Sequence, residues 1–373
     1  MKINVSKNEL LSRLRAVGKI IKQSNQQPAY NSFLIKIESE KIIRITGSDE
    51  QGRIETTVEC KIDGFEEKSF LIDSAILMNG LKEIPEQPIT IEVNDMKVVV
   101  KYYTGKFEIA LQDAALYPDF SFGDKGLKCE IVREQLYDGL KSVTKFTLTD
   151  DTLRPVMTAV NLESTGDTIT FAASTGHVLA IHENKNEDSQ YLFNINLPNK
   201  ISKIITDLTA IIDKSIQFIV SGNHVRFVIG DYIVSSRLVE GSYPNFRSVI
   251  PKNTEMVMII NASELIAAIN RVSVFSDESS SMIVLDIENN VLTLSAENID
   301  YSRSAKETLM LAEVYKPLKI GFKSSFLVDV LKTVSTETNE CELHFSGPNK
   351  AAIIRPRDSE VLTMILMPMM VNN

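Results

Sequence analysis

The sequence is poor in the residues that cross-link chains or carry out catalysis. Its 373 residues include three cysteines, four histidines and no tryptophan. Cys60, Cys129 and Cys341 lie far apart and form no CxxC pair, so neither a zinc ribbon nor a disulfide framework is indicated. We therefore expect reduced, buried thiols in a cytoplasmic protein.

Long apolar runs are also absent. The first residues, "MKINVSKNELL", contain no apolar segment of the kind that a signal peptide has. No stretch approaches the ~18–20 apolar residues that a membrane-spanning helix needs. The composition is otherwise that of an ordinary globular protein, with 43% hydrophobic and 24% charged residues. We expect a chain that makes no membrane contact.

Recognisable reaction chemistry is missing as well. His177 and His182 are five residues apart on an expected strand, so they face opposite sides and cannot share a metal ion. The chain has no phosphate-binding loop, dinucleotide-binding fingerprint or nucleophile elbow. We predict a binding protein with no catalytic residue, no metal and no cofactor. An enzyme that uses His177 with Ser174, in "ASTGHVLA", or with a nearby carboxylate stays open at this point.

What the sequence does contain is one pattern in three copies. A polar start followed by aliphatic residues at helical spacing recurs twice in each copy, and successive copies are offset by 121–130 residues. Alternating strands with Gly and Asn turns fill the remainder, and Ser48, Ser174 and Ser295 mark a turn between the paired helices. The fold class is therefore α+β, as three tandem domains. The expected helices span 6–22, 74–84, 132–146, 199–208, 261–275 and 323–335.

Two similar segments indicate where the copies join. "ALYPDFSFGDKG" follows the first copy and "VEGSYPNFRSVIPKN" follows the second, and both contain Tyr-Pro, then Asp or Asn, then Phe. Coincidence between two proline-containing turns is the alternative explanation. We place the domains at 1–124, 125–250 and 251–373.

Charge is unevenly distributed along the chain. The net charge of −9 alone argues against a nucleic-acid partner, yet the six expected helices together carry +7, which leaves −16 for everything else. Arg15, Lys19 and Lys22 recur at the spacing of a single helix face. If the helices share one surface, that surface is basic and attracts phosphates, while the sheets are acidic. Solvated helix faces without a ligand are the simpler alternative.

These features together resemble one family. Three tandem α+β domains with "LRPVMTAVNLE", "ASTGHVLA", "LVEGSYPNFRSVIP" and a terminal "MILMPMM" are similar, in this order and over the whole chain, to the bacterial DNA polymerase III β subunit, the sliding clamp. The resemblance implies a non-catalytic DNA-clamp fold, with two helices on antiparallel sheets in each domain. It implies a head-to-tail homodimer that forms a six-domain ring around double-stranded DNA, without reading sequence. The ring confers processivity in replication.

The resemblance also gives the apolar C-terminal tail a role. In the family, the tail helps to line a hydrophobic pocket for short linear motifs of the polymerase III alpha subunit, the clamp loader, other polymerases and repair proteins. Three positions depart from common family residues: Val178 and Ser248, where arginine is frequent, and Met370, in place of the arginine of a common ending that Asn372 and Asn373 extend. The pocket residues carried over are Arg154, Met157, Ser174, Gly176, His177, Leu179, Pro244, Val249, Ile365, Leu366, Met367, Pro368 and Met369.

Two further surfaces follow from the resemblance. A loop position that is basic in some relatives is Ser24 here, beside Asn25, and Lys22 is a candidate substitute. For the four dimer-interface residues, burial inside the protomer is the alternative. A repeat-built scaffold that binds no DNA also stays open. The expected DNA-facing residues are Arg15, Lys19, Lys22, Lys200 and Lys203, and the expected dimer interface joins Phe107 and Ile109 to Val274 and Phe275 of the partner copy.

Overall fold

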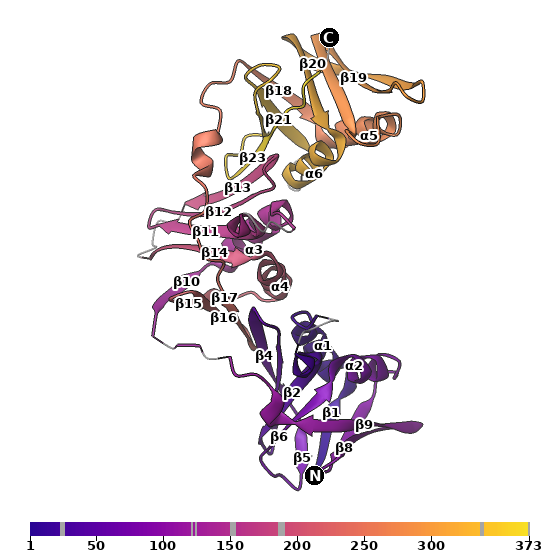
Figure 1. Cartoon of the computed structure of the whole chain (residues 1–373), viewed down its shortest axis with the longest axis vertical. Helices are drawn as coiled ribbons and strands as arrows, with labels where there is room; N and C mark the ends of the chain where they lie inside the picture. Colours follow the sequence, from indigo (N-terminus) through magenta and orange to yellow (C-terminus); the bar gives the residue numbers. More distant parts are fainter. Residues whose placement is uncertain are drawn as a thin grey trace. The chain divides into compact units, whose positions relative to one another are not determined.

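The computed structural model describes residues 1–22, 27–120, 122–123, 125–149, 154–185, 191–335 and 339–371. It contains helices and antiparallel sheets, as the α+β prediction requires (Figure 1). The chain divides into two compact units, one made of Met1–Tyr137 with Leu197–Val239 and the other of Asp138–Asn196 with Glu240–Asn373. Each unit is described separately below.

The six predicted helices are all present within the described ranges. Each observed helix lies inside its predicted range or within a residue of it. They are α1 (Lys7–Gly18), α2 (Ser74–Lys82), α3 (Arg133–Val143), α4 (Asn199–Thr209), α5 (Ala262–Ser273) and α6 (Ser324–Val334). Short 3-10 helices are η1 (Pro28–Asn31), η2 (Ala114–Leu116), η3 (Thr144–Phe146), η4 (Pro155–Thr158) and η5 (Phe246–Val249).

Side-chain caps explain where three of these helices begin. The Asp73 carboxylate accepts the Ile76 N–H at 2.8 Å at the start of α2, and the Asn261 side chain accepts the Glu264 N–H at 3.0 Å at the start of α5. Ser6 does the same for α1. A cap of this kind satisfies a backbone donor that has no partner in the first helical turn.

The first unit contains one continuous 13-stranded antiparallel sheet. Buried aliphatic residues of α1 and α2, among them Leu14 and Leu81, pack against it. In spatial order its strands are β10 (Leu127–Ile131), β15 (Ile216–Ser221), β16 (His224–Ile229), β17 (Tyr232–Arg237), β4 (Gly52–Glu59), β3 (Ile42–Ser48), β2 (Ser32–Ser39), β6 (Lys68–Asp73), β9 (Gly105–Asp113), β8 (Lys97–Tyr102), β7 (Pro88–Val93), β1 (Lys2–Ser6) and β5 (Lys61–Asp63).

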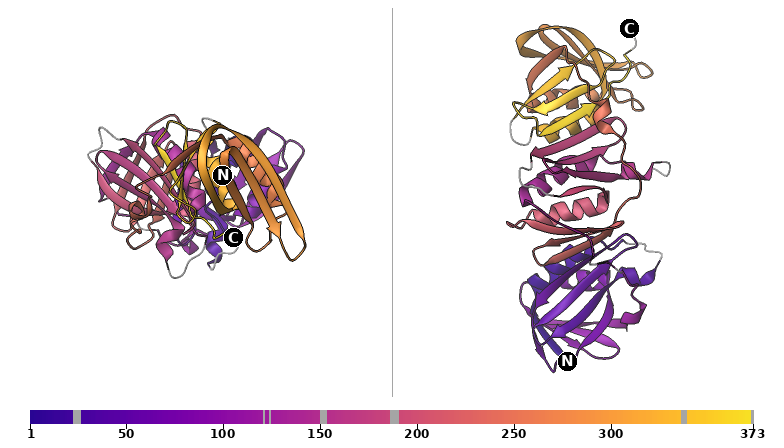
Figure 2. Two further views of the ribbon diagram at one scale, coloured as in Figure 1. Left: turned by 90° about the horizontal axis from the view of Figure 1, so that it is seen from above. Right: turned by 90° about the vertical axis from the view of Figure 1, so that its left-hand side faces the viewer.

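The second unit contains an 8-stranded sheet and a long two-stranded ribbon, drawn in orange in Figure 2. The ribbon pairs β19 (Met282–Asn298) with β20 (Arg303–Lys323), and α5 packs on it. In spatial order the sheet strands are β14 (Leu192–Pro198), β11 (Ala159–Thr165), β12 (Thr168–Ser174), β13 (Val178–Lys185), β23 (Leu362–Leu366), β22 (Ala352–Pro356), β21 (Glu340–Phe345) and β18 (Met256–Asn261).

Two strand pairings connect successive copies of the repeat, one in each unit (Figure 1). We call the pairing of β4 with β17 the first joint and that of β13 with β23 the second joint. The first runs from Gly52 opposite Ser236 to Thr56 opposite Tyr232. The second runs over the same number of residues, from Val178 opposite Leu366 to His182 opposite Leu362. The two pairings have the same length and direction, which favours duplication of a domain over a chance similarity between two proline-containing turns.

Three local predictions were wrong. Ser48 and Ser174 end strands before a turn, but Ser295 lies inside β19, and the turn of the third copy follows Asn298. The expected stripe on the first helix is interrupted because α1 ends at Gly18, so Lys19 caps it and Lys22 lies beyond it. Cys60 is half-buried rather than buried, unlike the other two cysteines.

Candidate functional site

An apolar cluster covers one face of the sheet at the second joint. It joins strands of two successive copies, because Leu179 comes from β13 and Ile365 from β23. Phe246 of the connecting segment 243–250 is part of the cluster, and Tyr243 packs against it. The buried members are Ala172, Leu179, Ile181, Phe246, Ile353 and Ile365.

The apolar tail continues from this cluster and is held in place by its backbone. The Met367 N–H donates to the His177 carbonyl at 2.9 Å, and the Met369 N–H donates to the Gly321 carbonyl at 2.8 Å. A side chain at Gly321 would come within 2.9 Å of Val371, so glycine lets the tail approach β20 closely. The tail therefore contacts both sides of the second joint.

The turn between β12 and β13 forms another edge of the cluster. The Ser174 hydroxyl donates to the Val178 carbonyl at 3.0 Å and accepts the Gly176 N–H at 3.0 Å. The imidazole of His177 stacks on Phe326 of α6, with ring centroids 5.7 Å apart. Both side chains are thus engaged in the turn and its packing, and they do not form the nucleophile–base pair that an enzyme built on them would need.

The predicted pocket residues fall into two groups. Met157, Leu179, Ile365 and Leu366 are buried, and the last three lie on the paired strands of the second joint. Exposure is greater for Ser174, Pro368 and Met369, which are partly buried, and for Arg154, Gly176, His177, Pro244, Val249 and Met367, which are exposed.

The three departures from common family residues also differ in exposure. Val178 is only 1% exposed, so the longer, charged side chain of an arginine could not be buried in the joint at this position. Ser248 is exposed, and its hydroxyl donates to the Asn245 carbonyl at 2.6 Å. Met370 is 81% exposed and is free to contact a partner.

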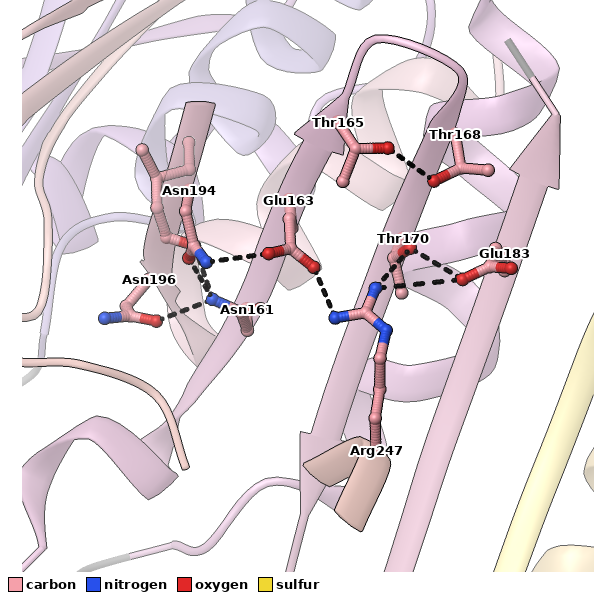
Figure 3. A network of polar contacts seen from close by, with 10 residues as sticks. Asn161, Glu163, Thr165, Thr168, Thr170, Glu183, Asn194, Asn196 and Arg247 are labelled. Atoms are coloured by element: carbon pink, nitrogen blue, oxygen red, sulfur yellow. Dashed lines mark hydrogen bonds and ion pairs between the residues drawn. The ribbon is translucent and has the colours of Figure 1, made fainter. Parts of the chain in front are cut away.

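Sequence reasoning missed the residue that fastens the connecting segment to the sheet. The Arg247 guanidinium donates to the Glu163 carboxylate at 2.6 Å and to the Thr170 hydroxyl at 3.3 Å (Figure 3). Thr170 in turn donates to Glu183 at 3.0 Å, and the guanidinium lies 4.8 Å from the Phe246 ring centre. A single arginine next to the Tyr-Pro-Asn-Phe motif was the only sequence signal.

Lys200, one of the expected DNA-facing residues, lies in the first joint. Its ammonium is 2.7 Å from Oδ2 of Asp49, a carboxylate that is fully buried, and it also donates to the Ile20 carbonyl. The other Asp49 oxygen accepts the N–H groups of Gln51 and Gly52, each at 2.9 Å. A charge-assisted pair of this kind stabilises the buried carboxylate, whose burial without a partner would cost several kcal/mol of free energy.

The other four expected DNA-facing residues are on or near the helices of the first unit. Lys19 pairs with Asp207 of α4 at 2.5 Å, and Lys22 lies 3.7 Å from Glu50. Arg15 and Lys203 are exposed and form no salt bridge with any described residue. The loop positions Ser24 and Asn25 lie outside the described residues.

The four expected interface residues also differ in how exposed they are. Ile109 is buried inside the protomer, and Phe107 is half-buried against Gly80 of α2, where a Cβ would come within 2.9 Å of its ring. Val274 and Phe275, which follow α5, are both exposed, Val274 at 73%.

Two observations bear on other functions. Among the described residues, no group of three His, Cys, Asp or Glu side chains could hold a metal ion. No helix in the described ranges is both long and apolar enough to cross a membrane.

Comparison with known proteins identifies the family. Models of the N-terminal, central and C-terminal domains of the DNA polymerase III beta subunit match residues 1–121, 132–245 and 247–370. The chain is 24% identical to the beta sliding clamps of Staphylococcus epidermidis and Pseudomonas aeruginosa, over 99% of its length and at least 99% of theirs.

Solved structures share the fold. The sliding clamp of Pseudomonas aeruginosa bound to griselimycin matches with a TM-score of 0.92 at 24% identity, and that of Bacillus subtilis with 0.90 at 21%, each over 100% of both chains. Three tandem clamp domains therefore account for the two joints and the repeated helix pairs. Because the three domain matches together span nearly the whole sequence, the chain belongs to the DNA polymerase III beta-subunit family, the beta sliding clamps, which are non-catalytic processivity factors of DNA replication.

Proposed function

We propose that two copies of this chain close head to tail into a six-domain ring that encircles double-stranded DNA and tethers its partners through the second joint. The observation that carries this proposal is the apolar cluster at that joint, bordered by exposed Val249 and Met367. A threaded ring needs no tight grip on DNA, and tethering raises the local concentration of a bound polymerase at the primer end.

The partner site would accept a short peptide with apolar side chains. The cluster supplies a rigid floor, while the methionines of the tail are flexible and polarisable, so they can repack around different sequences. Val178 and Met370 make this site less basic than the common family pattern. We expect it to bind motifs of the polymerase III alpha subunit, the clamp loader, other polymerases and repair proteins, with fewer acidic residues than usual.

Ring closure would cover the exposed apolar end of α5. Val274 and Phe275 are large side chains without cover in the protomer, and exposed apolar side chains of this kind are typical of an interface. They would meet the region of the partner copy that contains Phe107, with Ile109 supporting it from inside. A head-to-tail contact closes when its rotation is correct, and three domains per chain then give a dimer.

Arg15 and Lys203 are the best supported of the five expected DNA contacts, because their charges are exposed and unpaired within the described residues. Contacts between such side chains and phosphates position a duplex without reading its sequence. We place the domain boundaries at 1–124, 125–250 and 251–373, and the protein in the cytoplasm.

Retention on nicked circular DNA tests the ring. After loading, we expect the protein to stay on the circle in salt that removes electrostatically bound protein, and to be lost when the circle is cut. Equal loss from intact and cut circles would contradict encirclement. The mass in solution provides a second check, because a dimer of the 41.7 kDa chain is expected.

A further inference from the structure

The second joint has a cavity on the face of β13 opposite the apolar cluster. Its volume is about 610 Å³, within the range of small-molecule sites. Side chains alternate along a strand, so Leu179 and Ile181 contribute to the cluster while His182 and Asn184 line the cavity. Helices α3 and α6 supply further walls. The cavity is therefore separate from the proposed peptide site.

Positive charge dominates the walls of this cavity. Lys141, Lys145 and Lys332 line it, and Asp138 is the one carboxylate among its described lining residues. Lys145 lies 3.6 Å from the carboxylate of Asp329 and donates to its carbonyl at 2.9 Å. Burial lowers the pKa of Lys145, Asp329 opposes this shift, and the charge of Lys332 lowers the pKa by a smaller amount, so Lys145 and Lys332 lie close enough to repel each other. An anion between them would relieve the repulsion.

One buried donor on the walls is left without an acceptor. The side-chain nitrogen of Asn184 is buried and has no hydrogen-bond partner in the described part of the chain. A buried donor left unpaired costs free energy that an incoming acceptor would recover. The hydroxyls of Ser142 and Thr333 already donate to helix carbonyls, each at 2.8 Å, so their oxygens supply no further free hydrogen.

The corresponding helices of the first joint show how such cations are usually neutralised in this protein. Arg13 of α1 lies 2.7 Å from Asp231, and Lys19 lies 2.5 Å from Asp207. At the second joint Lys145 is paired with Asp329 in a similar way, but Lys332 has no salt bridge with a described residue. Lys332 therefore adds a positive charge beside the open volume that no described carboxylate neutralises.

We propose that this cavity binds a phosphate group, held by Lys141, Lys145, Lys332 and the Asn184 amide. A phosphate has several strong acceptor oxygens, and lysine is a common point-charge partner for it. The group is a free phosphate, or the phosphate of a nucleotide, that enters from solution. The site does not depend on the peptide surface or on ring closure.

Two substitutions in the full-length chain test this site. Lys332→Gln removes one exposed charge, and Asn184→Asp keeps the side-chain shape but replaces the free donor with an acceptor. Lys316→Gln and Lys350→Gln are matched controls, because both remove an exposed lysine of the C-terminal domain outside the cavity. Inorganic phosphate, a deoxynucleoside triphosphate and a 20-base-pair linear duplex are titrated separately at constant ionic strength.

We expect saturable binding that Lys332→Gln weakens about tenfold and Asn184→Asp weakens more, with both controls unchanged. An effect in the phosphate or nucleotide titration supports the proposal, and an effect in the duplex titration alone would overturn it, because these lysines would then contact DNA only. Equal binding by Lys332→Gln, by Lys316→Gln and by the unaltered chain in all three titrations would overturn the proposal. Retention on circular DNA, measured in parallel, reports on the ring and not on this cavity.

Discussion

The two joints are built on the same plan, yet they are closed by different interactions. In both, a polar residue in the turn before the first strand of the joint, β4 or β13, accepts two backbone N–H groups. Asp49 accepts those of Gln51 and Gly52, and Thr175 accepts those of His177 and Val178 at 3.3 and 3.0 Å. Only the aspartate has a second oxygen for a cation. The first joint therefore acquires an ion pair with a buried carboxylate, which Thr175 cannot form in the second joint.

The first residues of β4 and β13 also differ between the two joints. Gly52 begins β4, and a Cβ there would come within 2.9 Å of the Ser235 carbonyl, so the two backbones approach closely. Val178 begins β13 and buries a side chain instead. Arg53 lies over both Tyr117 and Phe120 in the first joint, with centroid distances of 5.9 and 5.7 Å. Duplication has thus left one joint closely packed and the other with the apolar cluster and the cationic cavity that we propose as binding sites.

Breaking the ion pair of the first joint should have the largest effect. Lys200→Met leaves the Asp49 carboxylate buried without a counter-ion, which costs about 3–5 kcal/mol of unfolding free energy. Urea denaturation measures this loss. Lys203→Met, on the exposed face of the same helix, should cost less than about 0.5 kcal/mol.

A double substitution separates charge burial from packing. Asp49→Asn with Lys200→Met removes both charges, so it should be less destabilising than Lys200→Met alone. If the double variant is the less stable of the two, lost packing rather than the orphaned carboxylate explains the first result.

Releasing the connecting segment of the second joint should have a smaller effect. Arg247→Met removes the contacts with Glu163 and Thr170, but the arginine is partly exposed, so we expect a loss of only about 1 kcal/mol. Because the segment borders the peptide surface, affinity for an alpha-subunit peptide should fall several-fold. Fluorescence anisotropy measures that affinity. Unchanged peptide binding with reduced stability would confine Arg247 to a structural role.

Acid should weaken the second joint. Burial lowers the pKa of His182 below its ordinary 6.5, while Asp138 and a hydrogen bond with Asn184 oppose the shift. The folded protein therefore keeps this histidine neutral, and the unfolded chain takes up its proton first. Its contribution to stability is complete above pH 6.5 and is lost as pH falls, by at most about 1.4 kcal/mol per pH unit.

Thr56 occupies the matching position in the first joint, so His182→Thr makes the two joints alike there. The unfolding free energy of this variant should depend less on pH between 4.5 and 6.5, as about one titrating group is removed. The readout is the slope and not the absolute stability, which the substitution also changes. An unaltered slope would show that other groups set the acid response.

The fold was predictable because its signals are local and repeated. Helical spacing, capping residues such as Asp73 and Asn261, and the two Tyr-Pro segments each specify structure over a few neighbouring residues. The error at Ser295 has the same origin. A small residue next to a polar one indicates a turn, but pairing with β20 continues β19 past it.

Charge roles were less predictable, because a sequence does not show which residues meet across the fold. The count of helix cations included Lys19 and Lys22, which the structure places beyond the end of α1. Lys200 is committed to Asp49, 151 residues away, and Lys19 to Asp207. Arg247 was overlooked for the same reason, since Glu163 and Glu183 lie on strands far from it in sequence. Arg15 forms no salt bridge with a described residue, so the prediction of an exposed positive charge applies there.

The smallest effect is expected at the end of the C-terminal tail. The first joint has no counterpart of this tail. Met370 is 81% exposed, so Met370→Ser should change the unfolding free energy by less than about 0.5 kcal/mol. A partner peptide that covers this flexible, apolar side chain would bind about threefold more weakly to the variant. Met96→Ser is the matched control, because Met96 is 79% exposed in the N-terminal domain and lies far from the second joint in sequence. Equal peptide affinity for both variants would place Met370 outside the binding surface and limit that surface to Val249, Met367 and the buried floor.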